Sequence, residues 1–442
     1  MTVIELGEVS SGSSPEEPSA PPRRSDVRRI AVLVVAVLTV LLVTGSERPE
    51  PRGLPLLWSV PLAGDQFVLT ADSLYMQASA GRPELIAYDA ADGTVRWRRP
   101  AGQPEYWINT DVPGVLLVPD FTDQQVTDEN GDTSTQPVVT ETAALDPRTG
   151  RELWRSSGEA SLRSGDLIQM SVWDDRSAGA TRFLVVNRAD GRVVWQIEPR
   201  PAVTNWTATG ADPQRPDRFI TATKDGLVEV RRMDTGAVVI RKQLPWLLPD
   251  SPVGAFAQLF GARSVLFVIR EDAGRQVIDA YRPETLDRLW SRAINMSHNF
   301  FECGGRICIS TGQGTVEAVD AATGKPAWTS AGWDYAREIT PDRLLTEHHQ
   351  GEFSGLIDAT DGRKILQFPD GLNLVDQTTG TVISLGANLT EPPGSPVSQP
   401  AADGTVVLRG LVGPVGNAGC QYTAGRLACA VTGGTLQVRD VG

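Results

Sequence analysis

The sequence is poor in the residues on which most catalytic sites depend. Its 442 residues include three histidines, His298, His348 and His349. A Ser-His-Asp site needs a histidine as base, and the sequence has no G-x-S-x-G nucleophile turn. His348 and His349 are adjacent, so on a strand they would point to opposite faces and could not serve one site together. A phosphate-binding G-x-x-x-x-G-K-[ST] loop is also missing, and the sequence therefore predicts a protein that is not an enzyme.

Basic residues are in deficit as well. Lys and Arg total 41 against 54 Asp and Glu, which gives a net charge of -13 at pH 7. A chain of this charge repels phosphate backbones unless its basic residues gather on one face, and no such face is evident in the sequence. Nucleic acid is therefore not an expected partner.

Long apolar runs are limited to one, near the N-terminus. Residues 30–45 are uncharged and largely apolar, and four arginines precede them, whereas only Arg48 and Arg52 follow soon after. This run is either an uncleaved single-pass anchor or a cleaved signal peptide, and the long leader before it favours the anchor. The charge difference predicts a cytoplasmic N-terminus at the cell membrane and an extracytoplasmic remainder. Residues 1–29, rich in Ser, Pro and Glu, are predicted to be a disordered tail, and residues 46–54 a linker.

Cysteines are few, and each lies close in sequence to another. The four are Cys303, Cys308, Cys420 and Cys429. In FFECGGRICIS a two-residue loop at Gly305 and Arg306 would set the first pair opposite each other, and in CQYTAGRLAC a loop at Ala424 and Gly425 would do the same for the second. Two cross-strand disulfides are predicted, in agreement with an oxidising compartment. Zinc is the rival interpretation, but its short-spaced cysteine pairs are usually C-x2-4-C.

What the sequence has in abundance is one short segment, repeated. The copies read LIAYDAADGTVRW, AALDPRTGRELW, LVVNRADGRVVW, VEVRRMDTGAVVI, IDAYRPETLDRLW, VEAVDAATGKPAW and GLIDATDGRKIL. Each is typical of a β-hairpin in which an Asp or Asn side chain caps the turn and a glycine adopts a positive φ. The turn glycines are Gly93, Gly150, Gly191, Gly236, Gly324 and Gly362. In the fifth copy Leu286 takes the place of glycine, so that turn is expected to be altered or strained.

The spacing of the copies predicts the architecture. From Trp58 to Leu366 the ends of the repeats recur every 44 residues on average, about the length of a four-stranded propeller blade. One step is longer because the polar segment 120–135 lengthens a hairpin. Residues 128–132 of this segment are rich in acidic residues and are interpreted either as a solvated loop or as a calcium site, although they do not match EF-hand spacing.

The two ends of the repeat region complement each other. LLWSVPL around Trp58 is a last strand without earlier ones, and the chain ends in inner strands without a last one. Their pairing would close the ring. We therefore predict an all-β, eight-bladed β-propeller over residues 55–442, preceded by one transmembrane helix. A further motif copy, NLVDQTTGTVI at Asn373 to Ile383, is either an insertion or the true seventh hairpin.

The pattern A-x-D-x-x-T-G-x-x-x-W resembles the pyrroloquinoline-quinone-like (PQQ-like, BamB-like) propeller repeat, and the resemblance covers the chain from about Trp58 to Val441. It implies that the terminal tryptophan of each blade packs against the next blade. These tryptophans are Trp58, Trp97, Trp154, Trp195, Trp290 and Trp328, and Ile240 and Leu366 mark blades with weaker docking. Quinoprotein dehydrogenases with this repeat use a disulfide between adjacent cysteines and a calcium site, but the sequence has no Cys-Cys dipeptide and the calcium ligands map onto no positions.

The sequence thus predicts a membrane-anchored extracytoplasmic propeller that binds or scaffolds a protein of the cell envelope, without a cofactor, a metal or catalysis. The ring is expected to be monomeric. The alternatives are a sensor for a small ligand and, less favoured, a PQQ-dependent dehydrogenase.

Overall fold

The computed structural model describes residues 52–442 apart from gaps at 65, 79–82, 102–107, 128–132, 174–178, 201–202, 213, 247–255, 273–274, 296–298, 311–313, 349–352, 370, 392 and 402–403. All of the named secondary-structure elements in this part of the chain are β-strands. It contains no helix with the length and apolarity needed to span a bilayer. The predicted tail and membrane segment, residues 1–29 and 30–45, lie outside the described residues, as do the acidic hairpin tip at 128–132, His298 and His349.

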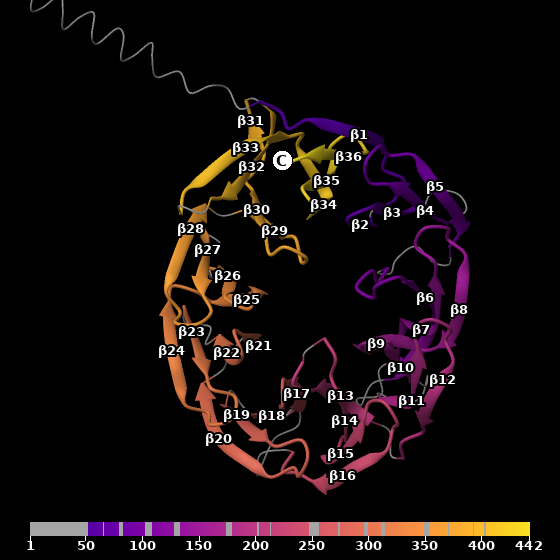
Figure 1. Ribbon diagram of the computed structural model, residues 1–442, viewed down its shortest axis with the longest axis vertical. Helices are drawn as coiled ribbons and strands as arrows, with labels where there is room; N and C mark the ends of the chain where they lie inside the picture. Colours follow the sequence, from indigo (N-terminus) through magenta and orange to yellow (C-terminus); the bar gives the residue numbers. More distant parts are fainter. Residues whose placement is uncertain are drawn as a thin grey trace, which may run out of the picture. The chain divides into compact units, whose positions relative to one another are not determined.

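The strands of the compact unit Gly53–Gly442 form antiparallel groups that follow one another around a ring, each running from an inner to an outer strand (Figure 1). The first four groups are β2 (Gln66–Leu69), β3 (Ser73–Ala78), β4 (Glu84–Asp89) and β5 (Val95–Pro100); β6 (Leu116–Thr127), β7 (Thr133–Leu145) and β8 (Glu152–Ser157); β9 (Glu159–Ser164), β10 (Leu167–Trp173), β11 (Ala180–Asn187) and β12 (Val193–Ile197); and β13 (Val203–Thr209), β14 (Arg218–Thr223), β15 (Leu227–Arg232) and β16 (Val238–Gln243). The third and fourth groups are joined into one sheet by a single pair, Ala180 with Val203.

The next four groups continue the ring. They are β17 (Phe256–Ala262), β18 (Val265–Asp272), β19 (Arg275–Tyr281) and β20 (Arg288–Asn295); β21 (Asn299–Cys303), β22 (Arg306–Ser310), β23 (Thr315–Val319) and β24 (Pro326–Ala331); β25 (Tyr335–Thr340), β26 (Arg343–Glu347), β27 (Phe353–Asp358) and β28 (Lys364–Pro369); and β29 (Leu372–Val375), β30 (Val382–Leu385), β31 (Leu389–Thr390), β32 (Pro393–Pro400) and β33 (Val406–Val412). The last group consists of β34 (Val415–Thr423), β35 (Arg426–Val431), β36 (Thr435–Asp440) and β1 (Leu56–Pro61).

The ring is closed as predicted, by pairing of the first strand with the last. Strand β1 runs antiparallel to β36, with Trp58 opposite Val438 and Val60 opposite Leu436. Buried residues of the last group, among them Trp58, share one apolar cluster with Phe67 and Leu74 of the first group. The closure therefore has both a hydrogen-bonded ladder and an apolar interface.

The predicted eight blades are not confirmed, because the groups formed by the described residues number nine. Nine apolar clusters match them, each shared by two consecutive groups around the ring. The difference lies in the motif copy at 373–383. Its turn joins the first and second strands of its group, β29 and β30, whereas the other turn glycines lie between the last two strands of their groups, as Gly93 does between β4 and β5 and Gly150 between β7 and β8. Residues 367–442 thus supply two groups where one was expected.

The repeat tryptophans dock on the turn of the following group, as the resemblance implied. Each indole Nε1 donates to a backbone oxygen of that turn. The bonds are Trp58 to Ala90 (3.1 Å), Trp97 to Pro147 (3.0 Å), Trp154 to Arg188 (2.7 Å), Trp195 to Met233 (2.8 Å), Trp290 to Ala321 (2.9 Å) and Trp328 to Ala359 (3.0 Å). The docking joins each group to its neighbour by a polar as well as an apolar contact.

The turn glycines have a second reason to be glycine, which the sequence did not reveal. A Cβ added to Gly150 would lie 2.6 Å from the Trp97 ring, and the same approach, between 2.5 and 2.7 Å, recurs at the other five turn glycines. Leu286 adopts a positive φ of 51°, which confirms the expected strain. Its turn receives Ile240 instead of an indole, and both residues belong to one apolar cluster. A smaller docking residue therefore leaves room for a side chain at the turn.

Both predicted disulfides are present, Cys303–Cys308 and Cys420–Cys429. Cys420 lies directly opposite Cys429, and Thr423 pairs with Arg426 across the Ala424–Gly425 turn. The loop expected at Gly305 and Arg306 was misplaced by one residue. Cys303 pairs with Arg306, so the turn is Gly304–Gly305 and the first disulfide runs diagonally. Both turn glycines have positive φ, 54° and 82°, a geometry that glycine adopts without steric cost.

Candidate functional site

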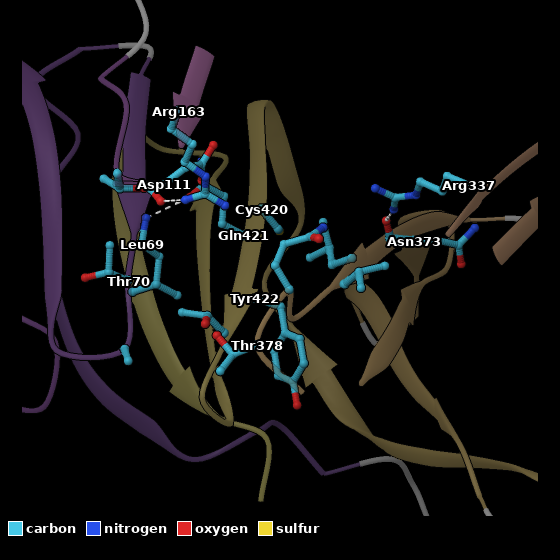
Figure 2. Close-up of a pocket in the computed structure, with 16 residues that line it drawn as sticks. Leu69, Thr70, Asp111, Arg163, Arg337, Asn373, Thr378, Cys420, Gln421 and Tyr422 are labelled. Carbon is cyan, nitrogen blue, oxygen red and sulfur yellow. Dashed lines mark hydrogen bonds between the residues drawn. The ribbon is translucent and has the colours of Figure 1, made fainter. Parts of the chain in front are cut away.

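The innermost strands of several groups line a cavity of about 570 Å³ (Figure 2). Its walls come from β2, β9, β25, β29 and β34 and from the adjoining turns. The lining residues are Leu69, Thr70, Ala71, Thr110, Asp111, Arg163, Arg337, Asn373, Leu374, Val375, Gln377, Thr378, Cys420, Gln421, Tyr422 and Thr423. Most of them are neutral, and the charged ones are a single carboxylate and two guanidinium groups. Such a lining is suited to binding by hydrogen bonds.

Gln421 on β34 holds the cavity together where the ring closes. Its Oε1 accepts a hydrogen bond from the Leu69 backbone N–H at 2.7 Å, and its Nε2 donates to the Phe67 backbone oxygen at 2.6 Å. Both partners belong to β2, the inner strand of the first group. The amide side chain therefore satisfies one donor and one acceptor of this strand, as a paired strand would.

Arg163 on β9 lies on the same side of the cavity as Asp111 (Figure 2). Its Nη1 donates to the backbone oxygen of Asp111, and its Nη2 donates to Oε1 of Gln214 at 2.7 Å. The guanidinium is thus held by two neutral oxygens. Its orientation is fixed while its charge remains uncompensated by those two partners.

Arg337 on β25 and Asn373 on β29 form the opposite wall (Figure 2). Arg337 Nη2 donates to the Asn373 backbone oxygen over 3.4 Å, a long and therefore weak hydrogen bond. The buried Asn373 amide donates through Nδ2 to Ser354 Oγ at 2.7 Å. Its Oδ1 accepts no hydrogen bond from the described residues. This oxygen is itself buried, so it is not exposed to a ligand in the cavity.

Asp376, behind the cavity wall, links two turns. Its carboxylate accepts hydrogen bonds from the backbone N–H groups of Thr378 at 2.9 Å and Ala424 at 2.9 Å. Burial raises the pKa of this carboxyl, but the backbone hydrogen bonds outweigh burial and hold its pKa below the ordinary value. The ionised side chain therefore ties the β29–β30 turn to the β34–β35 turn. Burial raises the pKa of the neighbouring Tyr422, whose phenol stays neutral.

The residues singled out from the sequence lie mostly away from the cavity. The docking tryptophans lie on outer strands and the turn glycines between the last two strands of their groups, so both serve the interfaces between groups. Among them only Cys420 lines the cavity, and its sulfur is in a disulfide. Across the described part of the chain, no group of three or more His, Cys, Asp or Glu is arranged to hold a metal ion. Arg337 and Gln421 were missed because they lie on inner strands outside the repeat motif. Asn373 begins the motif copy at 373–383, but the sequence did not reveal that this copy includes an inner strand.

Tandem four-stranded antiparallel groups around an axis, closed by the first and last strands, define a β-propeller. Residues 50–196 and 133–330 match the model of the family described as "Outer membrane protein assembly factor BamB", and the chain belongs to this family of PQQ-like propellers.

Solved structures resemble the chain at low identity. The crystal structure of BamB from Moraxella catarrhalis is 15% identical over 88% of this chain and 99% of that chain, with a TM-score of 0.43. A crystal structure titled as the eukaryotic initiation factor is 9% identical over 84% of this chain and 92% of that chain, with a TM-score of 0.51. The second likeness concerns the fold alone. No curated protein sequence matches the chain.

Proposed function

We propose that this propeller is a non-catalytic protein-binding or scaffolding module of the cell envelope. Segment 30–45 would hold it at the membrane as a single-pass anchor, with the N-terminus in the cytoplasm and the ring outside. The observation that carries the proposal is the polar cavity of about 570 Å³, to which at least five inner strands contribute. The family's description as an assembly factor supports a binding role, and the two disulfides support an oxidising compartment.

Crosslinking in intact cells tests the proposal. A photoreactive amino acid at Gln377, which lines the cavity, should capture a specific envelope protein that mass spectrometry identifies. The control position is Val193 on the outer strand β12, 44% exposed, where no such adduct is expected. Protease accessibility of the ring from outside the cell tests the topology. Equal adducts at both positions, or dye reduction by the chain with PQQ and calcium, would contradict the proposal.

A small-ligand sensor is the second candidate. The cavity volume lies within the roughly 300–1,000 Å³ of small-molecule sites, and this observation favours it. A ligand bound only by the folded ring raises its melting temperature. Thermal-shift screening of the full chain therefore separates the candidates: a stabilising metabolite, together with no protein adduct at Gln377, would favour the sensor.

A further inference from the structure

Exposed aliphatic side chains gather on the outside of the ring where the chain enters it. Of the exposed large apolar side chains in the described part of the chain, nearly half belong to β1, β31 and β33, which lie together at one side of the ring (Figure 1). Strand β33 exposes three in succession, between 38% and 49%, and no other described strand exposes more than two. A concentration of this kind marks an interaction surface. We refer to its six residues as the aliphatic wall: Leu56, Leu57, Leu389, Val406, Val407 and Leu408.

Hydrogen bonds and strand pairing hold the three strands of the wall together. Just before β1 begins, the Leu54 backbone N–H donates to the Leu411 oxygen of β33 at 2.8 Å. Leu389 of β31 pairs with Gly394 of β32, and the next residue of β32 pairs with Val412 of β33. Strands β1 and β31 therefore flank the C-terminal end of β33, whereas the three exposed aliphatic residues of β33 occupy its N-terminal half.

The charge on these strands is positive. Their single ionisable side chain is that of Arg409 on β33, whose Nε donates to the Gln399 side-chain oxygen at 2.8 Å. Arg52 is exposed and directly precedes the entry point, and Glu391 is an exposed acid in the turn after β31. Aliphatic side chains next to arginine suit a membrane interface, because acyl chains and anionic phosphates lie close together there.

The length of the tether limits how far the wall can lie from a membrane. The apolar run 30–45 ends eight residue steps before Gly53. A fully extended chain advances at most about 3.6 Å per residue, so these steps span no more than about 29 Å. With segment 30–45 as the proposed anchor, the entry point would lie within that distance of the bilayer. Gly53 bridges to Leu411 of β33, so the tether would hold the aliphatic wall close to the membrane surface.

We propose that the aliphatic wall rests on the lipid bilayer. Its side chains would enter the boundary between headgroups and acyl chains, and Arg409 would bind a lipid phosphate. The contact would give the ring one fixed orientation on the membrane, which a short tether alone does not provide. This inference goes beyond the proposed protein-binding function and rests on the proposed single-pass anchor.

Fluorescence of the full chain in nanodiscs of phosphatidylcholine and phosphatidylglycerol tests this inference. All four native cysteines are in disulfides, so a cysteine introduced as Val407→Cys can carry a polarity-sensitive fluorophore as the only label. Its emission should shift to the blue, and nitroxide-labelled lipids should quench it. The matched control is Val239→Cys, which is 39% exposed on β16, across the ring from β33 (Figure 1). Lipid quenching at this position should be absent.

Substitutions within the wall test which side chains make the contact. Leu56→Asp together with Leu408→Asp should reduce the quenching at position 407 several-fold, because carboxylates resist transfer into the acyl region. The paired control Val95→Asp with Val193→Asp changes side chains that are 45% and 44% exposed on other outer strands, and it should leave the quenching unchanged. Circular dichroism verifies that each variant is folded. Arg409→Gln should weaken the quenching as well, because a phosphate contact is lost.

The outcomes separate this inference from the proposed function. A chain that does not enter nanodiscs would contradict the anchor itself. A chain that enters them but is quenched equally at positions 407 and 239, or at neither, would overturn the bilayer contact and leave the anchor and the protein-binding role standing. A blue shift at position 407 without lipid quenching would mean that protein, such as a second copy, covers the wall, and quenching that survives the two aspartates would exclude the wall as its cause. Either result also overturns the inference.

Discussion

The contact between the Trp97 ring and the turn at Gly150 makes a quantitative prediction. In Gly150→Ala the new methyl group would lie 2.6 Å from the ring, at a φ of +68°. The left-handed backbone costs about 1–2 kcal/mol for a residue other than glycine. Displacing the ring adds about 1–3 kcal/mol of overpacking. The single substitution should therefore destabilise the chain by about 2–5 kcal/mol.

Replacing the Trp97 indole separates the backbone cost from the overpacking cost. In the Trp97→Ile background the alanine meets no indole, so its further cost should fall to the roughly 1–2 kcal/mol of the backbone alone. The coupling energy between the two sites is then about 1–3 kcal/mol, as expected for residues in direct contact. Ile240 and Leu286 are the precedent within the chain, because there a smaller docking residue occurs with a side chain at the turn.

Urea unfolding of the full chain in detergent, followed by far-ultraviolet circular dichroism, measures the cycle. The control is Gly165→Ala, since Gly165 has a φ of +57° but no atom within 4 Å of the added methyl group. It should cost about 1–2 kcal/mol in either Trp97 background. If Gly150→Ala costs the same with and without the Trp97 ring, the steric account of the turn glycines is refuted.

Three further predictions concern the closure and the inner strands. Gln421→Ala should cost about 1–3 kcal/mol in urea unfolding through two lost hydrogen bonds, whereas Gln377→Ala, at the same cavity, should change little. Replacing Cys420 and Cys429 together by serine should cost about 2–3 kcal/mol from the loop they close, and a variant as stable as the parent would contradict this. Burial raises the pKa of Glu338 above its ordinary 4.5, so the folded state binds the proton more tightly and stability falls as pH rises from about 4.5 through the raised pKa. Glu338→Gln should remove this fall, and unchanged pH dependence of the melting temperature would argue against the assignment.

The features that the sequence predicted correctly are local or repeated. The hairpin turns, the docking tryptophans and both disulfides each depend on residues within one motif copy or on the regular spacing between copies. Closure of the ring was also predictable, because Trp58 stands in a strand that lacks its own group. The misplaced turn between Cys303 and Cys308 shows the limit of this reasoning: two consecutive glycines allow more than one register, and the choice depends on pairing along the whole hairpin.

The ninth group and the cavity lay beyond sequence reasoning for different reasons. The motif copy near Gly380 has the usual letters but a different place in its group, and only strand pairing distinguishes the two arrangements. The cavity depends on contacts between distant positions. Gln421 and Leu69 are 352 residues apart, and neither belongs to a motif. A single glutamine on a strand gives no signal that its amide completes another strand's hydrogen bonds.

The outer strands dock neighbouring groups and the inner strands line the cavity, which explains why the repeat motif predicts the fold but not the ligand. Docking indoles and turn glycines lie at the outer part of each group, where a substitution disturbs the contact with the neighbouring group. The inner strands present different side chains from group to group, among them Arg163, Arg337 and Gln421, and most can change without touching an indole or its turn. Gln421 is the exception, because it both lines the cavity and joins the last group to the first. Binding specificity in such a ring is therefore set mainly by the inner strands, and Arg337, which makes one long hydrogen bond to a backbone oxygen, is a position where a change would cost the fold little.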